Sequence, residues 1–472
     1  MHWPAPESLS DLSDHQRGQY AAATGSNGYL VLLGGRPGTG KTFSLARILA
    51  KVPAGRSAVV APTGKAAVRI TESLQRAGVQ GMRATTIHSL LGPSRDEDSG
   101  EWAFEHDEAN PLDLDWIFVD ETSMCDCALL GSLLAARGSN CRVMLIGDVN
   151  QLAPVGHGAP LRDLIAAGLP LGNLVDIQRN AGRIVRCCHG IVDKHRFEPS
   201  PKLDLAAESP ENLLHIEKRE PEDQIETLKT VLEKFRQGAA LGERQIDPVW
   251  DCQVIVPVNA KSPLARVRLN AALQGYLNPG GESVKGSPFR VDDKVCCLKN
   301  GWISCGSTHG LKGGPWNESQ KDGKVYVANG ELGKVTAVAP NLTHIRLWLP
   351  DRLVKVPRGN TSDSEGDEES NGAGCEWDLA FAISGHKSQG SQWPVVITMA
   401  DAYPGARMLC DRAWLYTALS RAETLAMTIG QREVLDGMCA KSNMWQRKTH
   451  LVESIAELQQ QSAVQGWEAA LI

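Results

Sequence analysis

The stretch GRPGTGKT, Gly35–Thr42, decides the fold class of this chain. It matches the pattern G-x-x-x-x-G-K-[ST], follows the apolar run GYLVLLGG and opens a helical pattern over 42–52. A strand, a glycine-rich turn and a helix in this order form a phosphate-binding loop, in which backbone N–H groups and the helix N-terminus face phosphate oxygens. Because both flanks are correct, a chance glycine-rich turn is the weaker interpretation.

The loop predicts a site for ATP and Mg²⁺. Lys41 is expected to reach the β- and γ-phosphates, and Thr42 to ligate Mg²⁺. The candidate nucleotide-binding residues of the loop are Gly35, Pro37, Gly38, Thr39, Gly40, Lys41 and Thr42.

Two later apolar strands end in polar side chains. WIFVDE ends in Asp120, which could hold Mg²⁺ through water, and in Glu121, which could orient or deprotonate the attacking water. RVMLIGDVNQL delivers Asp148 and Gln151, and Gln151 could hydrogen-bond the γ-phosphate or that water. A strand followed by Asp-Glu is common in isolation. Since the carboxyl ends of parallel strands meet at one sheet edge, the convergence with the loop indicates a P-loop NTPase.

The composition is that of an ordinary globular protein. The chain has 472 residues, 42% hydrophobic and 22% charged, a length that suggests about three domains. The 49 Lys+Arg against 55 Asp+Glu give a formal net charge of −6, which excludes a highly basic nucleic-acid-coating protein but leaves room for a local basic groove. No apolar run approaches the roughly 20 residues of a membrane span, and the N-terminal sequence lacks the features of a secretory signal. We therefore expect no membrane partner.

The 12 cysteines indicate reduced thiols rather than a disulfide framework. They form no CxxC unit, which disfavours a zinc site built from paired units. Cys187, Cys188 and His189 could form a ligand cluster, but adjacent cysteines on a helix point in different directions. We expect no metal there.

The pattern of strands predicts two α/β cores and an insertion. The first third alternates apolar strands with helical patterns, which predicts a parallel sheet covered on both faces. Apolar strands at 251–258, 394–400 and 426–430 predict a second such core. From about 289 to 357, short strands alternate with Gly and Asn turns, which predicts a small inserted β-barrel.

Two shorter segments interrupt these cores. Residues 92–115 are interpreted as a β-hairpin with its tip near 94–100, and residues 360–374 as an acidic solvated loop or an interaction segment. The predicted domains are 1–176 for the first core, 177–260 with 375–472 for the second, and 261–374 for the insertion.

The motifs taken in order resemble those of superfamily 1 helicases, specifically the RecD/Dda-like 5′-to-3′ branch, over about residues 12–430. HKSQGS and TALSRA behind one P-loop are highly specific to it. The matching stretches are the Q motif at Asp14–Arg17, APTGKAA (61–67), TTIHSLLG (85–92), VDETSM (119–124), GDVNQLAPVGHGAPLRDL (147–164), IQRN (177–180), SGHKSQGSQWPVVI (384–397) and YTALSRAE (416–423).

The resemblance implies an α/β fold with two RecA-like P-loop NTPase cores, a pin that splits the duplex at the hairpin, and an SH3-like β-barrel at the insertion. It implies an ATP-dependent DNA helicase that translocates 5′ to 3′ on single-stranded DNA and separates duplex strands. The implied cofactors are ATP and Mg²⁺, and the implied partners are single-stranded DNA and its junctions with duplex. A monomer in the cytoplasm of a bacterial cell or a phage-infected host is expected.

The resemblance also assigns roles to residues. Arg179 and Arg421 would be arginine fingers that complete a catalytic set with Lys41, Glu121 and Gln151. Gln16 would read adenine, and Gly390 would lie at the nucleotide. Residues resembling those that touch the single strand are Pro62, Thr63, Lys65, Thr86, His88, His386 and Ser388. On the hairpin, Trp102 and Phe104 could stack on the junction base pair or could anchor the hairpin to the core.

The sequence departs from the family at two positions and leaves other functions open. Gln392 stands where many relatives have Glu, and Asn180 where Gln is frequent. One alternative is a nucleic-acid-stimulated ATPase that translocates or displaces bound proteins without unwinding. A P-loop kinase or metabolite NTPase would not need a second core bearing HKSQGS. RNA remains open as the track, since no residue is identified that would read a 2′-hydroxyl.

Overall fold

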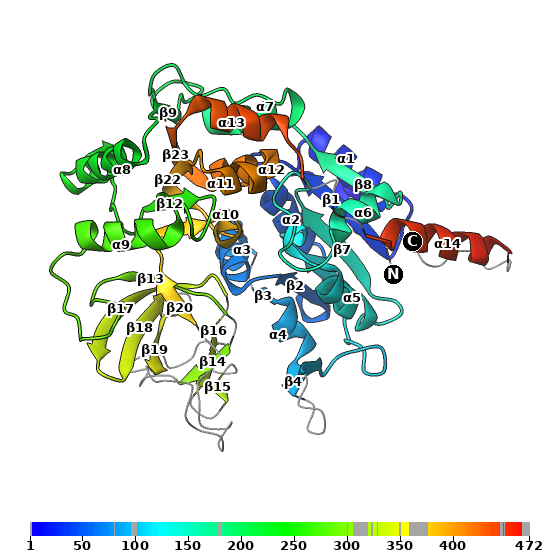
Figure 1. Ribbon diagram of the computed structural model, residues 1–472. Coiled ribbons are helices and arrows are strands. Elements are labelled where there is room, and N and C mark those ends of the chain that lie inside the picture. Colours follow the sequence, from blue (N-terminus) through cyan, green and yellow to red (C-terminus); the bar gives the residue numbers. More distant parts are fainter. Residues whose placement is uncertain are drawn as a thin grey trace.

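The computed structural model describes residues 2–79, 81–95, 102–176, 182–299, 301–304, 320–321, 324–327, 329–348, 351–357, 376–443, 447 and 449–464. Two parallel α/β units lie side by side, and an antiparallel unit lies beside the second (Figure 1). The predicted α/β class with parallel sheets is confirmed.

The first unit has a six-stranded parallel sheet in the order β3-β2-β6-β7-β1-β8. Successive side chains of a strand point to opposite faces, so Val31 and Leu33 join one apolar cluster and Leu32 the other. Because both faces are buried, the central strands β6 and β7 are buried along their whole length and are mostly apolar. The strands are β1 (Leu30–Gly35), β2 (Ser57–Ala61), β3 (Ala84–Thr86), β6 (Trp116–Val119), β7 (Arg142–Gly147) and β8 (Leu171–Leu174).

Helices cover both faces of this sheet. One face carries α1 (Asp14–Thr24), α2 (Lys41–Leu49) and α3 (Gly64–Arg76), and the other carries α4 (Ile87–Leu91), α5 (Cys127–Ala135) and α6 (Pro160–Ala166). Short 3₁₀ turns are η1 (Pro6–Ser8), η2 (Ala54–Arg56) and η3 (Thr122–Met124).

The second unit has a five-stranded parallel sheet in the order β21-β12-β22-β23-β9. Its strands are β9 (Leu213–Glu217), β12 (Cys252–Val256), β21 (Ala382–Ser384), β22 (Trp393–Ala400) and β23 (Ala422–Gly430). One face packs on α7 (Arg183–Asp193), α12 (Arg412–Leu419) and α13 (Arg432–Ala440), and the other on α8 (Pro221–Arg236) and α9 (Arg266–Leu277). Two short helices, α10 (Gly385–Ser388) and α11 (Pro404–Leu409), follow β21 and β22.

The inserted unit is an antiparallel sheet in the order β19-β18-β17-β13-β20. Its buried side chains, such as Val335 and Ile345, belong to the same apolar cluster as Val254 of the second unit, so the two share a core. The strand β20 lies beyond the predicted boundary at residue 374 and pairs with β13. The acidic segment 360–374 lies outside the described residues.

The strands of this unit are β13 (Lys294–Cys297), β17 (Leu332–Ala339), β18 (Leu342–Trp348), β19 (Asp351–Pro357) and β20 (Trp377–Leu379). A small sheet beside it holds β14 (Gly301–Ser304), β15 (Gln320–Lys321) and β16 (Lys324–Val327). In the second unit, β10 (Ala240–Leu241) and β11 (Arg244–Gln245) form a separate pair.

An antiparallel pair occupies the segment where a hairpin was predicted. β4 (Pro93–Arg95) pairs with β5 (Trp102–Phe104), and residues 96–101 between them lie outside the described residues. Its strands leave the first unit beside α4 (Figure 1). Its role as a pin remains a prediction.

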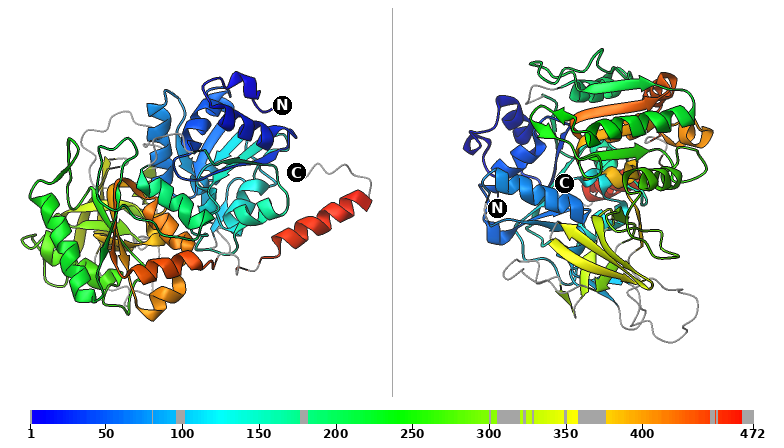
Figure 2. Two further views of the ribbon diagram at one scale, coloured as in Figure 1. Left: turned by 90° about the horizontal axis from the view of Figure 1, so that it is seen from above. Right: turned by 90° about the vertical axis from the view of Figure 1, so that its left-hand side faces the viewer.

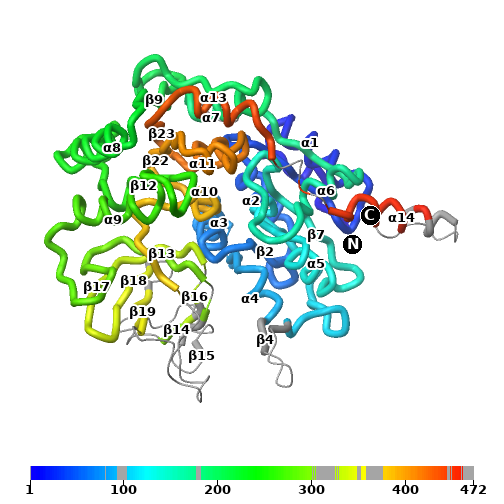
Figure 3. The backbone as a smooth tube through the Cα atoms, in the orientation of Figure 1, coloured from blue at the N-terminus to red at the C-terminus, as the bar shows by residue number. Residues whose placement is uncertain are grey.

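The last helix corrects one predicted boundary. α14 (Leu451–Val464) was assigned to the second unit, but it contacts α6 of the first. From there it projects away from the body of the molecule (Figure 2). Arg447 donates to the carbonyls of Gly156 and Gly158 at 3.1 and 2.9 Å, and Thr449 Oγ1 donates to Asp163 at 2.5 Å. The chain therefore crosses back to the first unit after α13 (Figure 3).

Membrane-spanning helices, disulfides and metal-binding clusters can be assessed only for the described residues. Within those ranges, no helix is both long and apolar enough to cross a bilayer. The ten described cysteines are free, and no group of three or more His, Cys, Asp or Glu side chains in the described part is arranged to hold a metal.

Candidate nucleotide site and strand-binding face

The loop between β1 and α2 is shaped by its glycines. Gly38 and Gly40 have φ of 79° and 82°, which glycine adopts without strain. A Cβ on Gly35 would lie 2.9 Å from both Lys41 Cγ and Thr39 Oγ1. The backbone therefore forms a close cradle that larger residues would fill, as a phosphate-binding loop requires.

Lys41 lies across this loop. Its Nζ donates to the carbonyl oxygens of Gly35 and Arg36 at 2.6 and 3.2 Å. Gln16 is buried: its Nε2 donates to the Thr39 carbonyl at 3.2 Å, and its Oε1 accepts from the Ser13 amide at 3.1 Å. Gln16 thus braces the P-loop, and its predicted contact with adenine remains a prediction.

The two carboxylates after β6 have opposite pKa shifts. Burial, with the neighbouring Glu121 charge, raises the pKa of Asp120 to about 6. Burial also opposes ionisation of Glu121, but the charges of Arg69, Arg421 and Lys41 outweigh it and lower the Glu121 pKa. Arg69 on α3 lies 3.3 Å from Glu121 Oε1. Glu121 is therefore held as a carboxylate, the form that a general base needs.

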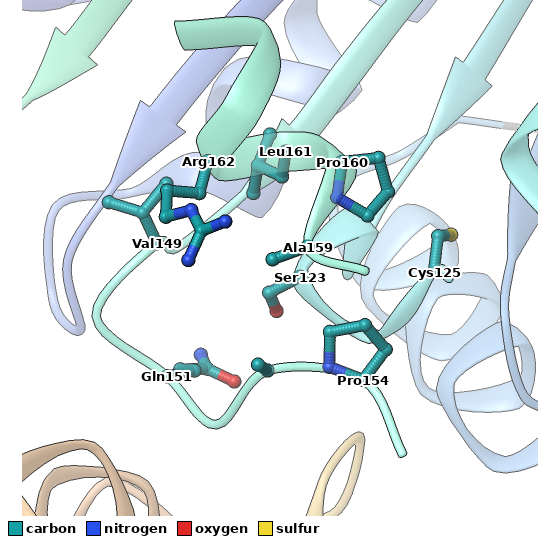
Figure 4. Close-up of a pocket in the computed structure, with 10 residues that line it drawn as sticks. Ser123, Cys125, Val149, Gln151, Pro154, Ala159, Pro160, Leu161 and Arg162 are labelled. Atoms are coloured by element: carbon teal, nitrogen blue, oxygen red, sulfur yellow. The ribbon is translucent and has the colours of Figure 1, made fainter. Parts of the chain in front are cut away.

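The residues after β7 connect the two units. Asp148 Oδ2 accepts from the Tyr416 hydroxyl of α12 at 2.5 Å, and both side chains are buried. Gln151 is also buried, and its Oε1 has no hydrogen-bond partner among the described residues. A cavity of about 20 Å³ separates it from Ser123, whose Oγ also lacks a described partner (Figure 4). That volume is enough for one water molecule.

Arg421 brings the second unit to this site. Arg421 is only 3% exposed, and its guanidinium is held within its own unit, because Nε donates to the Thr417 carbonyl at 3.1 Å and Nη2 to Ser420 Oγ at 3.1 Å. Burial lowers the pKa of Arg421, while the carboxylates of Glu121 and Asp148 in the first unit oppose that shift. Arg421 is therefore close enough to these acids of the first unit for their charges to act on it. Arg179 lies outside the described residues.

The site suits ATP with Mg²⁺. Mg²⁺ is commonly held by one or two protein oxygens together with phosphates and waters, so it needs no cage of several carboxylates. Thr42, in the first turn of α2, and Asp120, at the end of β6, would supply such oxygens. The glycine cradle and Lys41 would hold the phosphates.

The residues predicted to touch a strand begin at the start of α3. The Thr63 hydroxyl caps this helix by accepting from the Ala66 amide at 3.3 Å. Gly390 has φ of 71°, and a Cβ there would lie 3.1 Å from Ala66 Cβ and 3.3 Å from Thr63 Oγ1. Gly390 of the second unit therefore packs on the first turn of α3 in the first unit. Pro62, which lies two residues before the start of α3, is half-buried.

Lys65 on the same turn faces the second unit. Its Nζ lies 4.4 Å from the Trp393 ring centroid, and this buried atom has no hydrogen-bond partner among the described residues. Burial lowers the Lys65 pKa to about 7. In this arrangement the ammonium is turned toward Trp393 rather than toward solvent.

The other strand candidates differ in exposure. Thr86 caps α4 by accepting from the Ser89 amide, and the His88 ring lies 5.9 Å from the Phe104 ring of the hairpin, tilted by 59°. Phe104 thus anchors the hairpin to the first unit. His386 is exposed, but Ser388 is fully buried and donates to the Gly385 carbonyl at 2.6 Å, so it does not face a strand in this arrangement. The Trp102 side chain lies outside the described residues.

Sequence reasoning missed three contributors to the site. The sequence shows Arg69 four residues after Lys65 on a predicted helix, but it does not indicate that Arg69 meets Glu121. Tyr416 lies inside a quoted motif, but a tyrosine in a helix is usually a core residue. Arg36 pairs with Asp193, 157 positions away, and no local pattern indicates such a pair.

A P-loop, acidic strand ends and an arginine from a second parallel α/β unit together define a P-loop NTPase of the two-unit type. Residues 19–157 match the AAA domain family, and residues 379–428 match the UvrD-like helicase C-terminal domain. The RecD subunit of the RecBCD enzyme of Mycolicibacterium smegmatis is 30% identical over 431 residues, covering 86% of this chain and 69% of that protein. This chain belongs to the RecD family.

Two further proteins are similar to this chain. The ATP-dependent RecD2 DNA helicase of Deinococcus radiodurans is 29% identical over 463 residues, covering 96% of this chain. The chain spans 54% of the length of that relative. Among solved structures, the Pif1 helicase from Bacteroides in complex with ADP-AlF3 and ssDNA is 18% identical, with 97% of this chain and 98% of that chain covered and a TM-score of 0.48.

Proposed function

We propose that this chain is an ATP-dependent DNA helicase that translocates 5′ to 3′ on single-stranded DNA and separates duplex strands as a cytoplasmic monomer. The observation that carries the proposal is the placement of Arg421: this buried arginine of the second unit follows α12, whose Tyr416 and Thr417 hydrogen-bond to Asp148 and Leu152 of the first unit. Hydrolysis at such a site depends on how the two units are placed, so it can be coupled to their motion.

The residues divide the chemistry between them. Lys41 and the glycine cradle bind the phosphates, and Thr42 with Asp120 would hold Mg²⁺, which neutralises charge on the phosphates. Glu121, kept ionised by Arg69, accepts the proton of the attacking water, and Gln151 positions that water. Arg421 and Arg179 stabilise charge on the transferred phosphoryl group.

Movement of the units would be passed to the strand through their shared contacts. Thr417 Oγ1 accepts from the Leu152 amide at 2.9 Å, and Gln389 Nε2 donates to the Leu152 carbonyl at 2.9 Å. Leu152 directly follows Gln151, and Gln389 lies between His386 and Gly390. A change at the nucleotide would therefore reach the predicted strand face over a short path. The hairpin would act as the pin, and the antiparallel unit as the SH3-like domain.

The test compares ATPase activity with and without single-stranded DNA, and unwinding of duplexes with a 5′ or a 3′ overhang, with Lys41→Ala as the control. We expect DNA-stimulated hydrolysis and unwinding from the 5′ overhang alone. Stimulated hydrolysis without unwinding from either end would instead support an ATPase that translocates or displaces proteins. Hydrolysis that DNA does not affect would contradict the proposal.

A further inference from the structure

The second residue of the P-loop is held by the second unit. The Arg36 guanidinium makes two parallel hydrogen bonds of 2.7 Å to the two carboxylate oxygens of Asp193, at the end of α7. The Arg36 side chain is 17% exposed and the Asp193 side chain 51%. Two-point guanidinium–carboxylate pairs fix orientation as well as distance, unlike most surface ion pairs.

A second contact ties the same helix to the same loop. His189 Nε2, one turn before Asp193, lies 3.5 Å from the Pro37 carbonyl oxygen. The Arg36 carbonyl itself accepts from Lys41 Nζ and from Thr39 Oγ1 at 2.8 Å, so Arg36 belongs to the backbone that positions Lys41. A displacement of Arg36 would therefore move groups that bind phosphate.

The helix α7 also packs on the helix that leads to the arginine of the site. Cys188 lies in a fully buried cluster with Tyr416 of α12, and its Sγ is 4.0 Å from the Tyr416 carbonyl. Tyr416 binds Asp148, and Arg421 lies two residues after the end of α12. A continuous path of described contacts thus runs from the P-loop through α7 to α12 and Arg421.

We propose that Arg36 and Asp193 are positioning residues of the nucleotide site, whose ion pair sets the P-loop against α12, the helix that leads to Arg421. The inference rests on the proposed function and adds residues to it. The pair acts through Lys41 and Arg421 and does not itself contact the phosphates. Its loss should slow hydrolysis more than it weakens nucleotide binding.

The test uses the full chain with Asp193→Asn, Arg36→Gln and the double variant. We expect each single variant to lower the DNA-stimulated kcat about tenfold, with a smaller change in the KM for ATP. The double variant should be no slower than the worse single variant, because the two residues act as one unit. Asp193→Glu should restore part of the rate.

The matched control is Asp436→Asn. Asp436 has the same 51% exposure as Asp193 and also accepts two hydrogen bonds from one arginine, Arg432, but both lie on α13 away from the P-loop. It should leave kcat unchanged, and thermal unfolding should show that all variants are folded.

Three outcomes separate the possibilities. If Asp193→Asn behaves like Asp436→Asn while the wild type hydrolyses ATP, the inference is wrong and the proposed function stands. If Arg36→Gln raises the KM and Asp193→Asn has no effect, Arg36 binds phosphate directly and the positioning role is wrong. If the wild-type chain does not hydrolyse ATP, the proposed function fails and this inference fails with it.

Discussion

The two parallel units have the same kind of sheet, but they bring opposite charges to their interface. The first presents a glycine cradle and the carboxylates Asp120, Glu121 and Asp148 at its strand ends. The second presents Arg421, together with the hydroxyls of Tyr416 and Thr417 that bind the first unit. Neither set is a complete hydrolytic site. In the proposed mechanism the hydrolytic site therefore forms only where the two units meet, so we expect a substitution in either unit to change the activity of the whole site.

The largest effect should come from removing the contribution of the second unit. Arg421→Ala should lower the DNA-stimulated kcat about 10³-fold, because the developing phosphoryl charge loses its buried cation. Single-turnover hydrolysis and binding of a fluorescent ATP analogue would separate chemistry from binding. Arg421→Lys should be only partly active, since a lysine cannot reproduce the planar fork. A loss of less than tenfold in Arg421→Ala would contradict the division of chemistry described above.

A second effect should appear within the first unit as a shift in pH dependence. Arg69 lowers the pKa of Glu121, so Arg69→Gln should raise it. The acidic limb of the kcat profile should move to higher pH, and the variant should lose more activity at pH 6 than at pH 8. Arg76→Gln on the same helix is the control, because Arg76 is 77% exposed and pairs only with Glu72 among the described residues. An unchanged profile in Arg69→Gln would argue that Glu121 is not the base.

The smallest effect should be on stability, at Lys65. Its folded-state pKa of about 7 lies below the ordinary value of 10.5. Between these values the unfolded chain binds a proton that the folded chain does not, so wild-type stability should rise with pH across this window. Lys65→Met should lack this dependence and should be more stable than wild type at pH 7 by about 1–2 kcal/mol. The difference should shrink toward pH 10.

Chemical denaturation at several pH values measures this, with the exposed Lys202→Met as the control. Lower stability of Lys65→Met at pH 7 would mean that the contact with Trp393 outweighs the cost of burial. A fall in single-strand affinity without any gain in stability would favour the predicted strand contact of Lys65.

The sequence predicted the sheets well where strands are long and apolar. β1, β6, β7, β12 and β22 lie where their apolar runs placed them. The strands β3, β8, β9 and β21 were not predicted, because they are three to five residues long and carry polar or glycine residues that resemble loops. Such strands are specified by their neighbours in the sheet and not by their own pattern.

The site was predictable in its local parts and not in its distant ones. Lys41, Asp120 and Glu121 follow from the order of strand, turn and helix. Three other features depend on contacts between segments far apart in the sequence. They are the orientation of Lys65 toward Trp393, the burial of Ser388 and the packing of α14 on α6. The charge on a residue indicates that it needs a partner, but a single sequence does not say which partner it meets.

The return of α14 to the first unit has a consequence for how the two units can move. The chain passes from the first unit to the second between β8 and α7, and it passes back between α13 and Arg447. Two segments of the chain therefore connect the second unit to the first. We expect the second unit to rotate against the first about a line through these two connections. Two connections restrict this rotation more than a single linker would. Cutting one crossing should leave both units folded but should uncouple hydrolysis from strand movement.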